Sequence, residues 1–89
     1  MPRPAIVMYS KTTCPFCHEA AGLLKERGVV DFEQIQIDLE PGRRQEMLAK
    51  SGGRSTVPQI FIGDTHVGGC DDLFALDASG GLASLLEAN

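Results

Sequence analysis

Residues 5–18, AIVMYSKTTCPFCH, decide the fold. The apolar run over 5–9 is typical of a buried strand, and the residues that follow predict a helix over 14–27, ended by Gly28. Cys14 and Cys17 therefore stand one helical turn apart at a strand-to-helix junction. Residues three apart share a helix face, so the two sulfurs can come within bonding distance. The pair can thus alternate between a dithiol and a disulfide.

The two cysteines have different expected roles. At a helix N-terminus, the free N–H groups and the positive end of the helix dipole stabilise a thiolate, which is the nucleophilic form of cysteine. Cys14 is the first residue of the predicted helix, and Cys17 lies one turn further in. We therefore predict that Cys14 is the nucleophile and that Cys17 resolves the mixed disulfide.

The remaining pattern extends this junction into an α/β fold. Period-two alternation and turn residues indicate strands, and three- to four-residue spacing of apolar residues indicates helices. A β-α-β unit followed by a hairpin and helices predicts a mixed four-stranded sheet flanked by helices. The predicted elements are strands over 5–9, 32–37, 57–62 and 65–67, and helices over 14–27, 43–50, 71–76 and 82–87.

The length and net charge of the chain exclude several classes of protein. The chain has 89 residues, and we expect a single domain over 1–89. Its net charge of -4 argues against nucleic acid as a partner, because phosphate binding needs clustered Lys and Arg. The apolar stretches are too short to span a bilayer, and the first residues do not resemble a signal peptide. With only three cysteines, we expect a soluble monomer in the reducing cytoplasm, with no membrane partner.

A C-x-x-C pair alone leaves other roles open. Zinc sites share this spacing, and Cys70 with His18 or His66 would have to complete the tetrahedron. His18 directly follows Cys17 and points to another side of the helix, and no second C-x-x-C is present. We therefore expect no metal site, and we interpret both histidines as surface or structural residues.

Three segments together resemble a known family. Residues 11–18 (KTTCPFCH), 55–62 (STVPQIFI) and 68–73 (GGCDDL) are similar, in order and spacing, to the dithiol glutaredoxins, and most of all to the short bacterial type. The likeness covers nearly the whole chain. It implies a thioredoxin-like fold, a cis Val57–Pro58 peptide bond and no tightly bound cofactor. The implied reaction is the reduction of protein disulfides and glutathione mixed disulfides, with glutathione as co-substrate.

The resemblance also implies a binding groove for glutathione. Lys11 would hold the glycine carboxylate, Val57 would pair with the cysteine backbone of the tripeptide, and Cys70 with Asp71 would receive the γ-glutamyl end. A second partner for the glycine carboxylate is expected on the helix over 43–50. The full set of expected glutathione contacts is Lys11, Phe16, Arg44 or Gln45, Thr56, Val57, Pro58, Gly69, Cys70 and Asp71.

Several of these positions also have simpler interpretations. Lys11 could be a solvated loop charge, and the sulfur of Cys70 is expected to act only as a small buried hydrophobic group. Asp71 is also the expected N-cap of its helix. Phe16 departs from the tyrosine that many relatives carry, but its ring can still wall the sulfur site. Phe61, Phe74 and Leu76 are expected in the core.

Other functions remain as alternatives. Some glutaredoxins carry an iron–sulfur cluster held by the first cysteine of two subunits and two glutathiones, but Pro15 is unlike those members and favours the enzyme. A protein-interaction module with an inert C-x-x-C is a second alternative. Thioredoxins usually carry Trp-Cys-Gly-Pro-Cys, and this chain contains no Trp.

Overall fold

The computed structural model describes residues 4–87, which build a four-stranded mixed sheet in the order β2-β1-β3-β4. Strand β1 pairs in parallel with β2 and antiparallel with β3, and β3 pairs antiparallel with β4. This confirms the predicted α/β class. The elements are β1 (Ile6–Ser10), α1 (Pro15–Glu26), β2 (Glu33–Gln36), α2 (Arg43–Lys50), β3 (Gln59–Ile62), β4 (Thr65–Gly68), α3 (Cys70–Ala78) and α4 (Gly81–Glu87).

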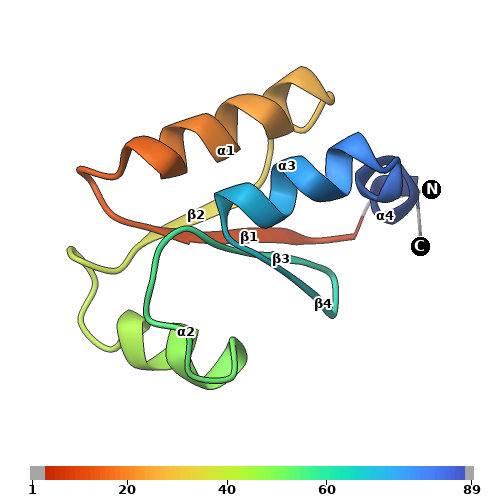
Figure 1. The fold of residues 1–89 in the computed structure, drawn as a ribbon. Coiled ribbons are helices and arrows are strands. Elements are labelled where there is room, and N and C mark those ends of the chain that lie inside the picture. The colour runs from red at the N-terminus through yellow and green to blue at the C-terminus, as the bar shows by residue number, and fades with distance from the viewer. Residues whose placement is uncertain (1–3, 88–89) are drawn as a thin grey trace.

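Helices cover the two faces of the sheet unequally. Helices α1 and α3 lie side by side across one face, α2 covers part of the other, and α4 lies near the two chain ends (Figure 1). The larger apolar cluster fills the first face and includes Met8, Leu24 and Leu73. The second face has a smaller cluster centred on Tyr9 and Met47. The Tyr9 hydroxyl donates a hydrogen bond to Glu46 of α2, which fastens that helix to the sheet.

The strand register brings three distant segments to one edge of the sheet. Tyr9, near the end of β1, pairs with Gln59 at the start of β3. Ile60 in turn pairs with Gly68 at the end of β4. The exit of β1, the entrance of β3 and the exit of β4 therefore meet. Helices α1 and α3 both begin at this edge, which is where open α/β sheets commonly bind ligands.

Several predicted boundaries need correction. The second strand is Glu33–Gln36 and the third is Gln59–Ile62, both shorter than predicted. Residues 57 and 58, which are joined by a cis peptide bond, lie in the connection before β3. Helix α3 begins at Cys70, one residue before the predicted start.

Two predictions of side-chain position are wrong. Gly69, and not Asp71, is the N-cap of α3, and its N–H donates to the Asp72 carboxylate at 2.9 Å. Phe74 is 44% exposed and not a core residue, because Leu73 occupies the buried face of the helix. Phe61 and Leu76 are partly buried against the two apolar clusters, as predicted. Within residues 4–87, no helix has the length and apolar character needed to cross a membrane.

Candidate active site

Cys14 is the N-cap of α1, in the turn that follows the central strand. Its Sγ accepts a hydrogen bond from the Cys17 backbone N–H at 3.2 Å, and no acidic residue lies in the first helical turn. Pro15 occupies the first position of the helix, where its missing N–H costs no intrahelical bond. The Cys14 sulfur is therefore held at the start of α1, against the backbone N–H of Cys17.

Cys17 lies behind Cys14 and is protected from solvent. Its side chain is 1% exposed, against 8% for Cys14. Burial, together with the hydrogen bond to the Cys14 side chain, raises the pKa of Cys17 to about 12. Cys17 is therefore a protonated thiol at neutral pH and must lose its proton before it can attack. Cys17 is thus the more deeply buried of the two cysteines, although they are only one turn apart.

The peptide bond between Val57 and Pro58 is cis, which confirms the expectation drawn from the family resemblance. This segment lies against the catalytic turn: the Val57 carbonyl oxygen is 3.9 Å from the Cys14 Sγ. Residues 43 positions apart in the chain are thus brought into contact by the pairing of β1 with β3.

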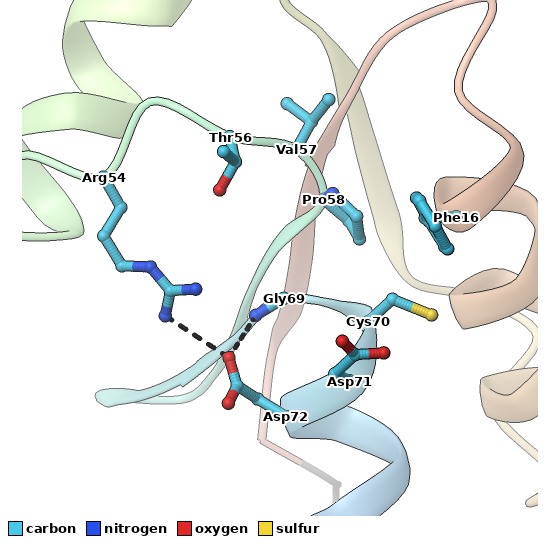
Figure 2. Close-up of a pocket in the computed structure, with 9 residues that line it drawn as sticks. All are labelled: Phe16, Arg54, Thr56, Val57, Pro58, Gly69, Cys70, Asp71 and Asp72. Carbon is cyan, nitrogen blue, oxygen red and sulfur yellow. Dashed lines mark hydrogen bonds and ion pairs between the residues drawn. The ribbon is translucent and has the colours of Figure 1, made fainter.

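A groove of about 310 Å³ opens next to this turn, and Figure 2 shows the side chains that line it. This volume lies within the usual range for small-molecule sites. Seven of the expected glutathione positions line the groove, and Arg54 and Asp72 are lining residues that the sequence prediction missed. The predicted lining residues are Phe16, Thr56, Val57, Pro58, Gly69, Cys70 and Asp71.

The start of α3 forms one wall of this groove. The Asp72 carboxylate accepts the Gly69 N–H at 2.9 Å and pairs with Arg54 at 3.3 Å, as the dashed lines in Figure 2 show. These two contacts hold the pKa of Asp72 below its ordinary value. Gly68 has φ +115°, and a Cβ there would collide with the Asp72 carboxylate. This conformation explains the glycine at position 68.

Arg54 and Asp72 could have been suspected from weak signals only. Arg54 is a single basic residue two positions before Thr56, and Asp72 is the second of two adjacent aspartates in the segment 68–73. Their ion pair joins the β3 entrance to α3 across 18 positions of sequence. Nothing in the local pattern of either segment indicates that they meet.

Three predicted contacts lie outside this groove. Lys11 is exposed in the β1–α1 turn, and Arg44 and Gln45 are exposed on α2. The turn that contains Lys11 is fixed by its neighbour Thr12. The Asp38 carboxylate accepts hydrogen bonds from the Thr12 hydroxyl and N–H, and the hydroxyl bond is 2.6 Å long. These bonds lower the pKa of Asp38. The choice between Arg44 and Gln45 stays open.

The Cys70 sulfur differs from that of Cys14 in its neighbours, because it faces a carboxylate. Its side chain is 7% exposed, and its Sγ lies 3.9 Å from a Glu19 carboxylate oxygen. Burial and the nearby Glu19 and Asp71 carboxylates raise the pKa of Cys70. This thiol therefore remains protonated at neutral pH, whereas its backbone lies at the start of α3 beside the groove.

The two histidines have no common site. His18 is exposed on α1, and His66 stacks on Phe61 and hydrogen-bonds to Gln59. In the part of the chain that the structure describes, no three His, Cys, Asp or Glu side chains gather in a way that could hold a metal ion.

Comparison with known proteins explains the combination of a cysteine-capped helix, a cis-proline turn and an adjoining groove. The family model described as Glutaredoxin matches residues 6–67. The chain belongs to the glutaredoxin family. Glutaredoxin 3 of Escherichia coli (strain K12) is 54% identical over 82 residues, which are 92% of this chain and 96% of that protein. A glutaredoxin of Pseudomonas aeruginosa is 52% identical over 96% of this chain and 99% of its own length.

Solved glutaredoxins share the fold. The solution structure of glutaredoxin from Brucella melitensis has a TM-score of 0.80 at 46% identity, covering 96% of this chain and 90% of that one. The crystal structure of a buckwheat glutaredoxin–glutathione complex has a TM-score of 0.83 at 31% identity, covering 93% and 76%. The protein is therefore a glutaredoxin of the thioredoxin-like fold, a glutathione-dependent disulfide oxidoreductase with Cys14 and Cys17 as its dithiol pair.

Proposed function

We propose that Cys14 is the nucleophile of this glutaredoxin and that Cys17 resolves the intermediate. The observation that carries this assignment is the difference between the two sulfurs: Cys14 caps α1 beside the groove, whereas Cys17 is buried behind it with a pKa of about 12. The attacking group in thiol–disulfide exchange is a thiolate with access to its target. Cys14 is the less buried of the pair, and its sulfur lies 3.9 Å from the carbonyl oxygen of Val57, which lines the groove.

The reaction on a glutathione mixed disulfide needs Cys14 alone. The Cys14 thiolate attacks the glutathione sulfur, a new sulfur–sulfur bond forms, and the client leaves as a thiolate that takes up a proton. A second glutathione thiolate then attacks the mixed disulfide on Cys14. Oxidised glutathione leaves, and the Cys14 thiolate is restored. One free glutathione is consumed in each cycle, and the glutathione removed from the client forms the other half of the oxidised glutathione.

The reaction on a protein disulfide needs both cysteines. Cys14 attacks one client sulfur and forms an intermolecular disulfide. Cys17 then loses its proton and attacks the Cys14 sulfur, which releases the reduced client and leaves a Cys14–Cys17 disulfide. Two glutathione molecules reduce this internal disulfide in turn. The hydrogen bond from the Cys17 N–H to the Cys14 sulfur keeps the two cysteines close enough for the second step.

The groove next to Cys14 suits an extended tripeptide. We propose that the cysteine backbone of glutathione pairs with Val57, whose carbonyl oxygen is 3.9 Å from the Cys14 Sγ. A glutathione cysteine bound there would have its sulfur beside the nucleophile. Phe16, Thr56 and Pro58 would line the middle of the tripeptide, as the groove geometry supports.

The two charged ends of glutathione would lie on opposite sides of Val57. Gly69, Cys70 and Asp71, at the start of α3, would receive the γ-glutamyl group. Because the Gly69 N–H already donates to Asp72, N–H groups of the first helical turn would bind the carboxylate, and the Asp71 carboxylate would bind the ammonium group. Arg54 adds a positive charge at this end of the groove. The glycine carboxylate would bind Lys11 and either Arg44 or Gln45, on the α2 side.

These roles agree with a simple oligomeric state, cellular location and set of partners. We propose that residues 1–89 act as one domain and as a monomer in the cytoplasm, with glutathione as co-substrate and disulfide-containing proteins as clients. The protein would then carry electrons from glutathione and help to maintain the redox balance of the cell. Nucleic acid and membranes are not proposed as partners, and no tightly bound cofactor takes part.

The choice of reductant tests this proposal. Purified protein is supplied with a disulfide substrate and either glutathione with glutathione reductase or thioredoxin reductase alone, and NADPH consumption is measured. We expect turnover only with glutathione and its reductase. Turnover with thioredoxin reductase alone would contradict the proposed glutathione groove.

A further inference from the structure

A buried polar chain connects the β3–β4 hairpin to the groove. The Gln59 side chain is fully buried at 0% exposure. Its amide nitrogen donates to the Thr56 carbonyl oxygen at 3.0 Å and lies 3.3 Å from the Thr56 hydroxyl oxygen. Its amide oxygen lies 2.7 Å from the His66 Nε2. Gln59 therefore links a groove residue to a histidine on the next strand.

The direction of each hydrogen bond is fixed by the chemistry of the groups. The Thr56 carbonyl can only accept, so the Gln59 nitrogen must face it, and the Gln59 oxygen must then face His66. His66 must donate from Nε2, because an amide oxygen only accepts. Burial lowers the pKa of His66, with Arg54 acting in the same direction and Asp72 opposing it. At neutral pH the ring is therefore neutral and carries its proton on Nε2.

The His66 ring is itself held in place by packing. It stacks on the Phe61 ring at 4.7 Å between centroids, and Phe61 meets Tyr9 edge-on at 5.8 Å. Phe61 and His66 are paired across β3 and β4, next to an irregularity in the strand register. The sheet thus orients His66, and His66 orients the Gln59 amide. The amide nitrogen in turn contacts both the carbonyl and the hydroxyl oxygen of Thr56.

We propose that Gln59 is a positioning residue, oriented by His66, that holds the Thr56–Val57 edge in the geometry that binds glutathione. This inference rests on the proposed function of the groove. Gln59 does not line the groove, so it acts on binding only through Thr56. Loss of Gln59 should weaken glutathione binding and leave the thiol chemistry of Cys14 intact.

Gln59→Met and His66→Phe test the two links separately. Methionine keeps the length of glutamine without its hydrogen bonds, and phenylalanine keeps a ring that can stack on Phe61. Gln34→Met is the matched control, because Gln34 donates a comparable bond to Ser10 from the exposed edge strand β2. The measurements are the Kd for S-methylglutathione, KM and kcat for a glutathionylated peptide, and the rate of Cys14 alkylation by iodoacetamide.

For Gln59→Met, we expect the Kd and KM to rise about tenfold, which is ~1.4 kcal/mol. The rise for His66→Phe should be smaller, at about threefold, because the Gln59 bond to Thr56 remains. For both variants, kcat and the alkylation rate should stay within about twofold of the wild type, since a loss of binding alone moves KM and not kcat. Gln34→Met should match the wild type throughout.

Two results would overturn the proposal. One is an unchanged Kd and KM for Gln59→Met. The other is a parallel fall in kcat and alkylation rate, which would show general disruption. If Gln59→Met does not fold, NMR of the His66 ring nitrogens in the wild type decides: protonation at Nε2 supports the chain, and protonation at Nδ1 overturns it. Failure of the wild type to bind S-methylglutathione would instead remove the proposed function itself.

Discussion

A cysteine stands at the start of both α1 and α3, at the same edge of the sheet, but the charges around the two cysteines differ. Cys14 caps α1, whose first turn has no acidic residue. Cys70 is the first residue of α3, whose first turn contains Asp71 and Asp72, and its sulfur faces Glu19. The positive end of α1 is thus left for a thiolate, whereas carboxylates already occupy the start of α3.

The two helix starts therefore have different proposed roles: the start of α1 holds the reacting thiol, and the start of α3 binds glutathione. At α1 the backbone N–H of Cys17 is directed at a sulfur, whereas at α3 the Gly69 N–H is directed at the Asp72 carboxylate. A cysteine at a helix start is therefore not reactive by position alone. We propose that the acidic or neutral character of the first turn decides which of the two thiols attacks a disulfide.

Removing each thiol in turn should give the largest contrast. Cys14→Ser should lower the rate on glutathione mixed disulfides by roughly 10³-fold or more, because the covalent intermediate cannot form. Cys70→Ser is the matched control and should retain most of the wild-type rate. The test is the coupled glutathione reductase assay. A large loss for Cys70→Ser would show that the start of α3 takes part in the chemistry.

Cys17→Ser should separate the two proposed reactions. The protein disulfide route needs the Cys14–Cys17 disulfide and should fall to background, whereas the glutathione mixed-disulfide route should persist. Parallel assays with a protein disulfide and a glutathionylated peptide measure both. Equal loss of the two rates would contradict the role of Cys17 as a resolving thiol.

The buried thiol of Cys17 predicts alkaline instability of the reduced protein. Its folded pKa of about 12 lies above its ordinary value, so its contribution to stability is complete below about pH 9 and is lost as the pH rises toward 12. The slope is about 1.4 kcal/mol per pH unit across this window. Urea denaturation between pH 8 and pH 11 should show a flatter decline for Cys17→Ser than for the wild type. Identical slopes would contradict the pKa assigned to this thiol.

Lys11→Ala tests the glycine end of the groove. Because Lys11 is exposed, the loss of one charge pair is worth at most about 1 kcal/mol, so KM for a glutathionylated peptide should rise about two- to fivefold with kcat retained. Lys25→Ala, in the last turn of α1, is a control of equal charge and should leave KM unchanged. An unchanged KM for Lys11→Ala would remove Lys11 from the site. The effect should shrink at high salt.

Asp72→Asn should have the smallest effect, below about 1 kcal/mol of stability at pH 7, because the pair with Arg54 is largely exposed. The folded pKa of Asp72 is lowered, so the carboxylate stabilises the protein above about pH 4 and this contribution is lost as the pH falls through the folded pKa. Urea denaturation of both proteins at pH 7 and pH 3 measures this. A stability difference that is the same at both values would contradict the assignment.

The fold was predictable from sequence because its signals are local. The apolar run of β1, the Cys14 junction and the alternation in β2 each indicate one element, and the β-α-β order restricts the topology. Boundaries were less predictable where a neighbouring element decides them: β3 begins only after the cis bond, and α3 begins one residue earlier than predicted. Phe74 was misplaced because a rotation of one position moves a side chain from the core to solvent.

The site was predictable where its residues are contiguous. Residues 56–58 and 69–71 all line the groove, because each set belongs to one segment. Arg54 and Asp72 were missed because their pairing depends on how β3 and α3 meet, which no local pattern records. The role of Gln59 was hidden for the same reason, since a buried glutamine in a strand shows its partners only in three dimensions.

Competitive alkylation of the three thiols is the most direct test of the difference between the two helix starts. The reduced protein is treated at pH 7 with less than one equivalent of iodoacetamide, and mass spectrometry of its peptides measures the label on each cysteine. We predict that nearly all of the label is on Cys14, with little on Cys17 and Cys70. Comparable labelling of Cys70 would contradict the claim that the first turn of each helix determines which thiol reacts.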